Sequence, residues 1–143
     1  MSEAINNNEA QGKRSKEDIL LETRKQLDEI VGLSSKGKLV LSKPLRSDGE
    51  IVKELLFDFG ALTAWEYVDA VDNAGVKKPD AYHMNGRQAL ALFAAAAAKQ
   101  TPHVDDKDII GTLAPQDAIA AIQVATVFFN ASSRAGSMRT MKT

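Results

Sequence analysis

The chain contains no cysteine, which excludes disulfide bonds, thiolate chemistry and zinc sites built on thiolates. Such a composition fits a reducing compartment. An excess of charge is also missing, because 18 basic and 19 acidic residues leave a formal net charge of −1. This balance gives no global attraction to nucleic acid or to an anionic membrane. The longest apolar run, from Ala89 to Ala98, has about half the length that a membrane-spanning helix needs.

What is present is typical of one globular domain, with 143 residues, of which 44% are hydrophobic and 26% charged. The first residues, MSEAINNNEAQ, are polar, so we expect no signal peptide and a disordered segment over residues 1 to 14. The last twelve, SSRAGSMRTMKT, carry three basic residues and no acidic one. We expect residues 132 to 143 to form a disordered basic tail.

The segment from Lys38 to Ala70 predicts a β-hairpin followed by a helix. Apolar residues occupy odd positions on both sides of Asp48-Gly49, and side chains at alternate positions share one face of a strand. A register that keeps both sets on one face must pair odd with odd positions. We therefore predict a three-residue loop, Ser47 to Gly49, with Gly49 in the left-handed region. The predicted pairs are Leu45 with Ile51, Leu41 with Leu55, and Leu39 with Phe57; Pro44 indicates an edge strand.

Helical spacing and capping residues predict the remaining elements. Helices are expected from Ser15 to Gly32, from Thr63 to about residue 73, from about Gly86 to Lys99, and from Pro115 to about Asn130. A Ser/Gly-rich linker is expected at 33 to 37 and a short helical turn at 105 to 110. The fold class predicted is α+β, with an N-terminal hairpin packed on a bundle of three to four helices and preceded by an extra N-terminal helix.

The largest apolar side chains suggest both a core and a binding surface. Trp65 is expected in the core, since the chain has few aromatic residues. The last helix is apolar around much of its circumference, as in helices that a partner buries. Phe128 and Phe129 point about 100° apart on a helix, so one core rarely accommodates both. We expect a partner-binding row of Val124, Val127 and Phe128, and an inward set of Ala118, Ile122, Ala125 and Phe129.

No motif predicts catalysis, a cofactor or a metal site. His83 and His103, the latter followed by Asp105-Asp106, could contribute to a metal site, but without short ligand spacing two solvated histidines are favoured. The Gly12-Lys13 pair lacks the upstream glycine of a phosphate-binding loop, and no G-x-S-x-G sequence occurs.

The first third of the chain is locally basic, which leaves nucleic-acid binding open. Acidic residues are interleaved with the basic ones and no aromatic residue is available for stacking, so a solvated helix is favoured. The basic residues are Lys13, Arg14, Lys16, Arg24, Lys25, Lys36 and Lys38.

The order of these motifs resembles the small tail assembly chaperones of tailed bacteriophages, of the type found in Mu-like and P2-like contractile-tailed phages and prophages. L-x-L-S-K-P-L begins at Leu39, and a D-G turn and V-x-E-L-x-F-D-F follow. L-T-A-W-E-Y-V-D-A begins at Leu62, and Q-V-A-T-V-F-F-N ends at Asn130. The resemblance covers residues 38 to 131, and residues 1 to 37 form an extension outside it.

The resemblance implies a protein without enzymatic activity, acting in the host bacterial cytoplasm. Its partner would be the tape measure protein, a long helical chain that sets tail length, whose apolar stripes aggregate unless covered. Several such phages also make a longer form by ribosomal frameshifting, and self-association stays open. The alternatives are a helical adaptor or virion structural component, or a nucleic-acid-binding regulator that uses the basic N-terminal helix.

Overall fold

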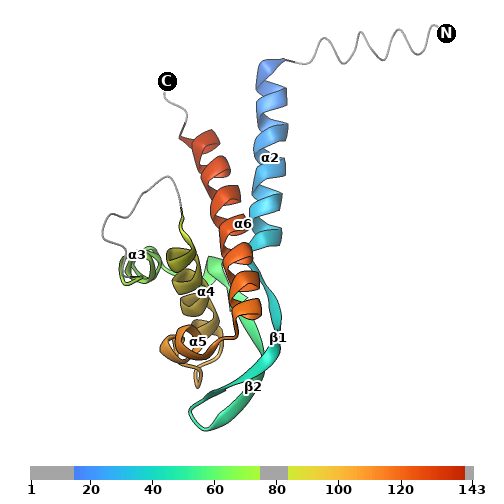
Figure 1. The fold of residues 1–143 in the computed structure, drawn as a ribbon. Coiled ribbons are helices and arrows are strands. Elements are labelled where there is room, and N and C mark those ends of the chain that lie inside the picture. The colour runs from blue at the N-terminus through green and yellow to red at the C-terminus, as the bar shows by residue number, and fades with distance from the viewer. Residues whose placement is uncertain (1–14, 75–83, 141–143) are drawn as a thin grey trace, which may run out of the picture.

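The computed structural model describes residues 15–74 and 84–140, which form an α+β fold (Figure 1). A long helix leads into a two-stranded antiparallel hairpin, and four further helices follow. The elements are α2 (Lys16–Ser35), β1 (Lys36–Ser47), β2 (Glu50–Asp58), the 3-10 turn η1 (Phe59–Ala61), α3 (Ala64–Asp72), α4 (Gly86–Gln100), α5 (Asp106–Thr112) and α6 (Pro115–Arg139). The predicted fold class is confirmed.

The hairpin turn has two residues instead of the three predicted. Ser47 pairs with Glu50, and Asp48 and Gly49 both have positive φ, at 51° and 79°. Two left-handed residues are typical of the primed turns that favour Asp-Gly. The left-handed position of Gly49 is therefore confirmed, whereas the three-residue loop is wrong. As a consequence Ile51, expected on the core face, is 60% exposed.

A bulge in β1 changes the register between the turn and the far end of the hairpin. Near the turn Leu45 pairs with Val52, whereas beyond the bulge Val40 pairs with Glu54. Four residues of β1, 41 to 44, thus lie opposite a single residue of β2. Bulges leave the extra residues unpaired and bend the strand.

The bulge restores the shared apolar face that the sequence pattern requires. Beyond it, odd positions pair with odd positions, and half-buried Leu39 lies opposite buried Leu55. The predicted pairs of Leu39 with Phe57 and Leu41 with Leu55 are wrong, because the extra residues in β1 shift each partner. Pro44 lies inside the bulge, where no ladder hydrogen bond needs its missing N–H.

The core is centred on α4, which packs against α3, α5, α6 and β2. Phe93 and Ala97 of α4 are fully buried and Leu90 is half-buried, so these three residues form the face of the helix that packs in the core. The ring of Phe93 lies 5.2 Å from that of Phe57, and Phe57 lies 5.3 Å from Phe59. This aromatic chain joins β2 and η1 to the central helix.

Asp117, in the first turn of α6, fastens the bulge to that helix. Its Oδ1 accepts a hydrogen bond from the backbone N–H of Ser42 at 2.8 Å, and its Oδ2 accepts one from Lys43 at 3.3 Å. Burial raises the pKa of Asp117, but these two hydrogen bonds, together with the Ser42 side chain, outweigh burial and leave the pKa below its ordinary value. The carboxylate thus satisfies backbone groups that the bulge removes from the ladder.

Ser47, at the end of β1, joins the hairpin to α5. Its buried hydroxyl donates to Oδ2 of Asp108 at 2.8 Å and accepts from the backbone N–H of Asp105 at 3.2 Å. A buried hydroxyl requires such partners, because leaving it unpaired is costly. This connection sets where the hairpin tip lies against α5.

Two helices extend further than predicted. The expected linker at 33 to 37 is wrong, because α2 continues to Ser35 and β1 begins at the next residue. The hydroxyls of Ser34 and Ser35 donate to the carbonyls of Val31 and Gly32, and so satisfy acceptors in the last turn.

The expected disorder of residues 132 to 143 is wrong for 132 to 139, which continue α6. Ala131, just before this segment, and Ala135 within it are buried one helical turn apart. The segment is polar in composition, but two small residues on one face give it a packing surface.

Candidate partner-binding surface

Helices α2 and α6 form an antiparallel pair that projects beyond the other elements (Figure 1). Ser15 caps α2 by accepting the backbone N–H of Asp18 on its hydroxyl at 3.1 Å. None of the 20 residues of α2 is buried. Helices in proteins gain most of their stability from tertiary packing, and α2 obtains its packing chiefly from α6.

An apolar groove of about 320 Å³ lies where the end of α2 meets α6 and the hairpin. Two of the three predicted partner-binding residues, Val124 and Val127, line it. Val124 is half-buried, whereas Val127 is 55% exposed. Across the groove lies Leu33, which is 84% exposed. The remaining lining residues are Ser34, Lys36, Phe57 and Gln123.

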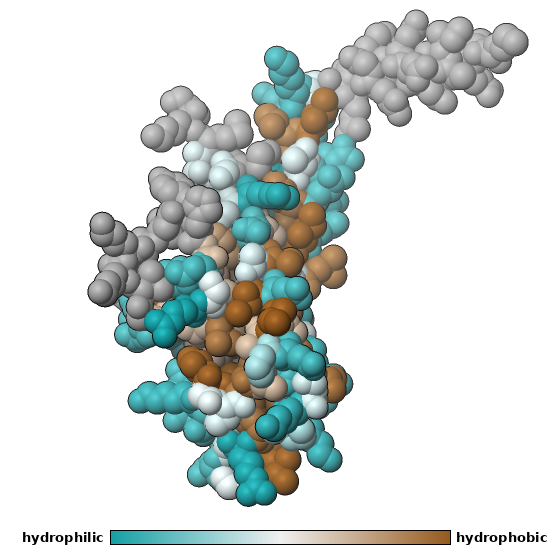
Figure 2. All heavy atoms as spheres, viewed as in Figure 1, coloured by the Kyte–Doolittle hydropathy of each residue, from teal (hydrophilic) through white to brown (hydrophobic). Residues whose placement is uncertain are grey.

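Three exposed apolar residues of α2 lie on the side of the helix that carries Leu33, with mostly polar residues between the first and the second of them. These exposed residues are Ile19, Ile30 and Leu33. Ile30 follows Ile19 by 11 residues, which is about three helical turns, and Leu33 follows Ile30 by 3, which is about one turn. Figure 2 shows apolar residues running along much of the helix pair in that view. The sequence pattern does not point to Leu33 as a candidate, because its segment is expected to be a linker, although its spacing from Ile30 is a helical signal.

Phe128 lines a different hollow from the other two predicted binding residues. Its ring stacks on Phe59, with centroids 4.8 Å apart, and it packs against the edge of the core. Phe128 and Phe129 both line a second hollow, of about 370 Å³, between α6 and α3. Val124 and Phe128 are both half-buried against the core cluster, so the expectation that they form one outward row is wrong.

The inward set predicted for α6 is only partly correct. Ala125 is fully buried, but Ala118, Ile122 and Phe129 are half-buried. A partner-binding role for Val124, Val127 and Phe128 stays a prediction.

Trp65 is not a core residue, contrary to expectation, and is 77% exposed. Helix α3 turns Tyr67 toward the core, and a residue two positions earlier points about 200° away from it. Burial raises the pKa of Tyr67, in keeping with this orientation.

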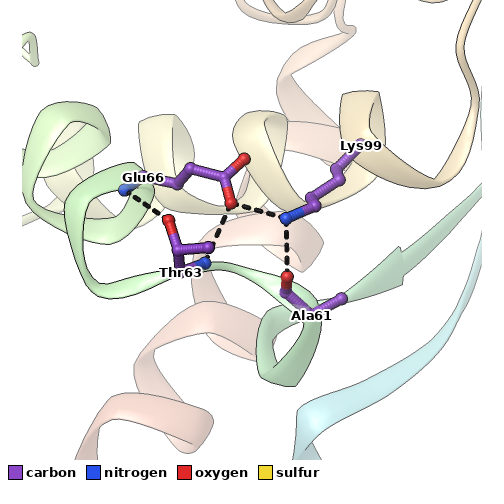
Figure 3. Close-up of polar contacts among 4 residues, drawn as sticks. All are labelled: Ala61, Thr63, Glu66 and Lys99. Atoms are coloured by element: carbon purple, nitrogen blue, oxygen red, sulfur yellow. Dashed lines mark hydrogen bonds and ion pairs between the residues drawn. The ribbon is translucent and has the colours of Figure 1, made fainter.

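A polar cluster holds α3 against α4, as Figure 3 shows. Lys99 of α4 donates to the carboxylate of Glu66 and, at 2.7 Å, to the carbonyl of Ala61. Thr63 and Glu66 form a capping box at the start of α3. The hydrogen bond from Lys99, followed by that from the Thr63 backbone, lowers the pKa of Glu66 from 4.5 to about 2. The Glu66 carboxylate is thus ionised in its contact with Lys99.

His103, Asp105 and Asp106, which could contribute to a metal site, interact with other protein groups instead. Nε2 of His103 lies 3.2 Å from a carboxylate oxygen of Glu50, and Asp105 and Asp106 both accept the backbone N–H of Lys107. Across residues 15–74 and 84–140, no group of three or more histidine, aspartate or glutamate side chains is placed to hold a metal ion. His83 lies outside the described residues.

The net charge of α2 is negative rather than positive. The helix carries three basic residues, Lys16, Arg24 and Lys25, against five acidic ones. This distribution disfavours the phosphate backbone of a nucleic acid as its ligand. Lys13 and Arg14 lie outside the described residues.

Comparisons with known proteins give no relative: no protein family, no curated protein and no solved structure matches the chain. Among the described helices, none has the length and apolar character needed to cross a membrane.

Proposed function

We propose that this protein is a tail assembly chaperone of a tailed bacteriophage, which binds the tape measure protein and keeps it soluble in the host bacterial cytoplasm. The observation that carries the proposal is the groove between α2 and α6, where Leu33 and Val127 are both exposed. The sequence resemblance over residues 38 to 131 supplies the identity of the partner.

A tape measure helix has the chemistry that this surface would bind. Its apolar stripe presents side chains three or four residues apart, which is the spacing that helix-in-groove recognition uses. The groove offers apolar walls from Leu33, Phe57, Val124 and Val127. Exposed Ile30, one turn before Leu33, extends the apolar surface along α2. Covering the stripe in this way would prevent tape measure chains from aggregating.

Co-expression with the tape measure protein of the same genome tests the proposal. The full-length chain is expected to keep the tape measure protein in the soluble fraction and to co-purify with it. Leu33→Asp with Val127→Asp is expected to abolish both effects while leaving the circular dichroism spectrum unchanged, because both side chains are exposed. The matched control is Val40→Asp with Leu56→Asp, which places two charges at exposed apolar positions of the hairpin.

The results of this experiment distinguish the proposed groove and function from the alternatives. If the Leu33/Val127 variant still captures the tape measure protein, the binding surface lies elsewhere on the chain. If the unaltered chain does not capture it, the proposed function is wrong. Presence of the chain in finished virions would favour a structural component, and retention on DNA at moderate salt would favour a regulator.

A further inference from the structure

The outer face of α3 carries an exposed aromatic anchor on the opposite side of that helix from the core. Trp65 is 77% exposed, and Val68, one turn further along the same face, is 41% exposed. Within the described part of the chain, neither belongs to the core cluster. Exposed tryptophan is costly to leave in water and is enriched among the residues that dominate binding energies.

The same face carries two carboxylates that form no ion pair with the described residues. Asp69 and Asp72 follow Trp65 by four and seven positions, so the three side chains share one side of α3. The helix contains a third acid, Glu66, and no basic residue. Lys99 engages Glu66, but neither Asp69 nor Asp72 forms an ion pair within residues 15–74 and 84–140.

The position of these two carboxylates on the helix is electrostatically unfavourable. Both lie in the last turns of α3, where the helix dipole presents partial negative charge and acidic side chains are disfavoured. A cation placed over this end would interact favourably with both carboxylates and with the dipole. The face of the Trp65 ring would attract the same cation.

We propose that the outer face of α3 is a docking site for a peptide segment of a partner protein in which an arginine lies beside an apolar side chain. The guanidinium stacks on Trp65 and pairs with Asp69 or Asp72, and the apolar neighbour contacts Val68. Arginine fits better than lysine because its planar group both stacks on an aromatic ring and pairs with carboxylates. This site lies on a different element from the α2/α6 groove and does not depend on the function proposed above.

Trp65 is the only tryptophan in the chain, so its fluorescence reports directly on this face. The probe is a synthetic fifteen-residue helical peptide, of a length of about four turns, with arginine and leucine in neighbouring rows. Titration into the full-length chain is expected to give a saturable blue shift of the Trp65 emission. The same peptide with citrulline in place of arginine keeps the shape of the side chain without its charge. It is expected to bind at least about tenfold more weakly than the arginine peptide.

Variants of the protein distinguish binding at α3 from nonspecific attraction of the cationic peptide to any acidic surface. Asp69→Asn with Asp72→Asn keeps the reporter and is expected to weaken binding about tenfold. The control, Asp28→Asn with Glu29→Gln, removes two exposed carboxylates from α2 and should bind like the unaltered chain. Trp65→Ala, followed through the anisotropy of a labelled peptide, should lose binding, whereas Leu56→Ala should not.

Three outcomes would overturn the proposal. Equal affinity for the arginine and citrulline peptides would make the face purely apolar. Equal binding by the Asp69/Asp72 variant and its α2 control would remove the charge pairing. A blue shift that appears on concentrating the chain alone, before any peptide is added, would show that a second copy covers Trp65 instead.

Discussion

Replacing Asp117 should have a larger effect on stability than any other substitution of an acidic residue described above. The carboxylate holds two backbone N–H groups of the β1 bulge, at 2.8 and 3.3 Å, and is itself buried. In Asp117→Ala those donors lose their acceptor at the point where hairpin and α6 meet. The control is Gln116→Ala, an exposed neighbour in the same helical turn.

The expected magnitude follows from the two hydrogen bonds. Hydrogen bonds to a charged group contribute roughly 1.5–3 kcal/mol each, but the 3.3 Å bond is long and burial of the carboxylate offsets part of the gain. We therefore expect Asp117→Ala to lower the free energy of unfolding by about 2–4 kcal/mol. Asp117→Asn keeps one acceptor and should lose about half as much. Gln116→Ala should stay within about 0.5 kcal/mol of the unaltered chain.

The effect should also depend on pH in a defined direction. The pKa of Asp117 in the folded protein lies below its ordinary value of 3.8. A carboxyl group of this kind contributes stability that is complete above the ordinary pKa and is lost as the pH falls through the folded-state pKa. The difference between the unaltered chain and Asp117→Asn should therefore be constant above that ordinary value and shrink below it.

Urea unfolding followed by circular dichroism is the appropriate assay, because Trp65 is too exposed to report on unfolding by fluorescence. Comparing the unaltered chain with the variant at each pH removes the contribution of other acidic residues, including Glu66. If Asp117→Ala and Gln116→Ala have the same urea midpoint and slope, water accepts the hydrogen bonds of the bulge N–H groups equally well. The role assigned to Asp117 is then refuted.

The other predictions concern the turn, the aromatic residues and the hairpin tip. Gly49→Val should destabilise by about 1 kcal/mol or more because its φ is +79°, and Gly49→Asn should cost less; equal urea midpoints would contradict the primed turn. Trp65→Ala should change stability by less than about 0.5 kcal/mol, whereas Phe93→Ala, in the fully buried core, should cost about 3–5 kcal/mol; calorimetric melting of both compares them directly. Ser47→Ala should cost about 1–2 kcal/mol, because Asp108 and a backbone N–H lose their shared partner; an unchanged melting temperature would show that water replaces the hydroxyl.

The features that the sequence predicted correctly are set by neighbouring residues. The capping box of Thr63 and Glu66 starts α3, and Pro115 starts α6. Gly49 takes the left-handed conformation expected of it in the hairpin turn. Each of these signals acts within about four residues, so no knowledge of the rest of the molecule is needed to read it.

The features that were missed depend on contacts far along the chain. The register of the hairpin depends on a bulge whose backbone is satisfied by Asp117, 75 residues away from Ser42. The last turns of α6 are ordered against α2, which no local signal in residues 132 to 139 indicates. The exposure of Trp65 depends on which face of α3 meets α4, and its large apolar surface alone favours the opposite prediction.

The position of α6 explains why the candidate binding surface lies where it does. Its first half packs through Ala121 and Ala125 on the core, and its second half has Ala131 and Ala135 buried where α2 runs beside it. Alanine at these positions lets both neighbours approach closely, so the bulky apolar residues of α6 occupy the flanks between the two contacts. Val127 lies on such a flank, between the two alanine pairs. A partner bound there would contact α2 and α6 together and would hold α2 more firmly than its own packing does.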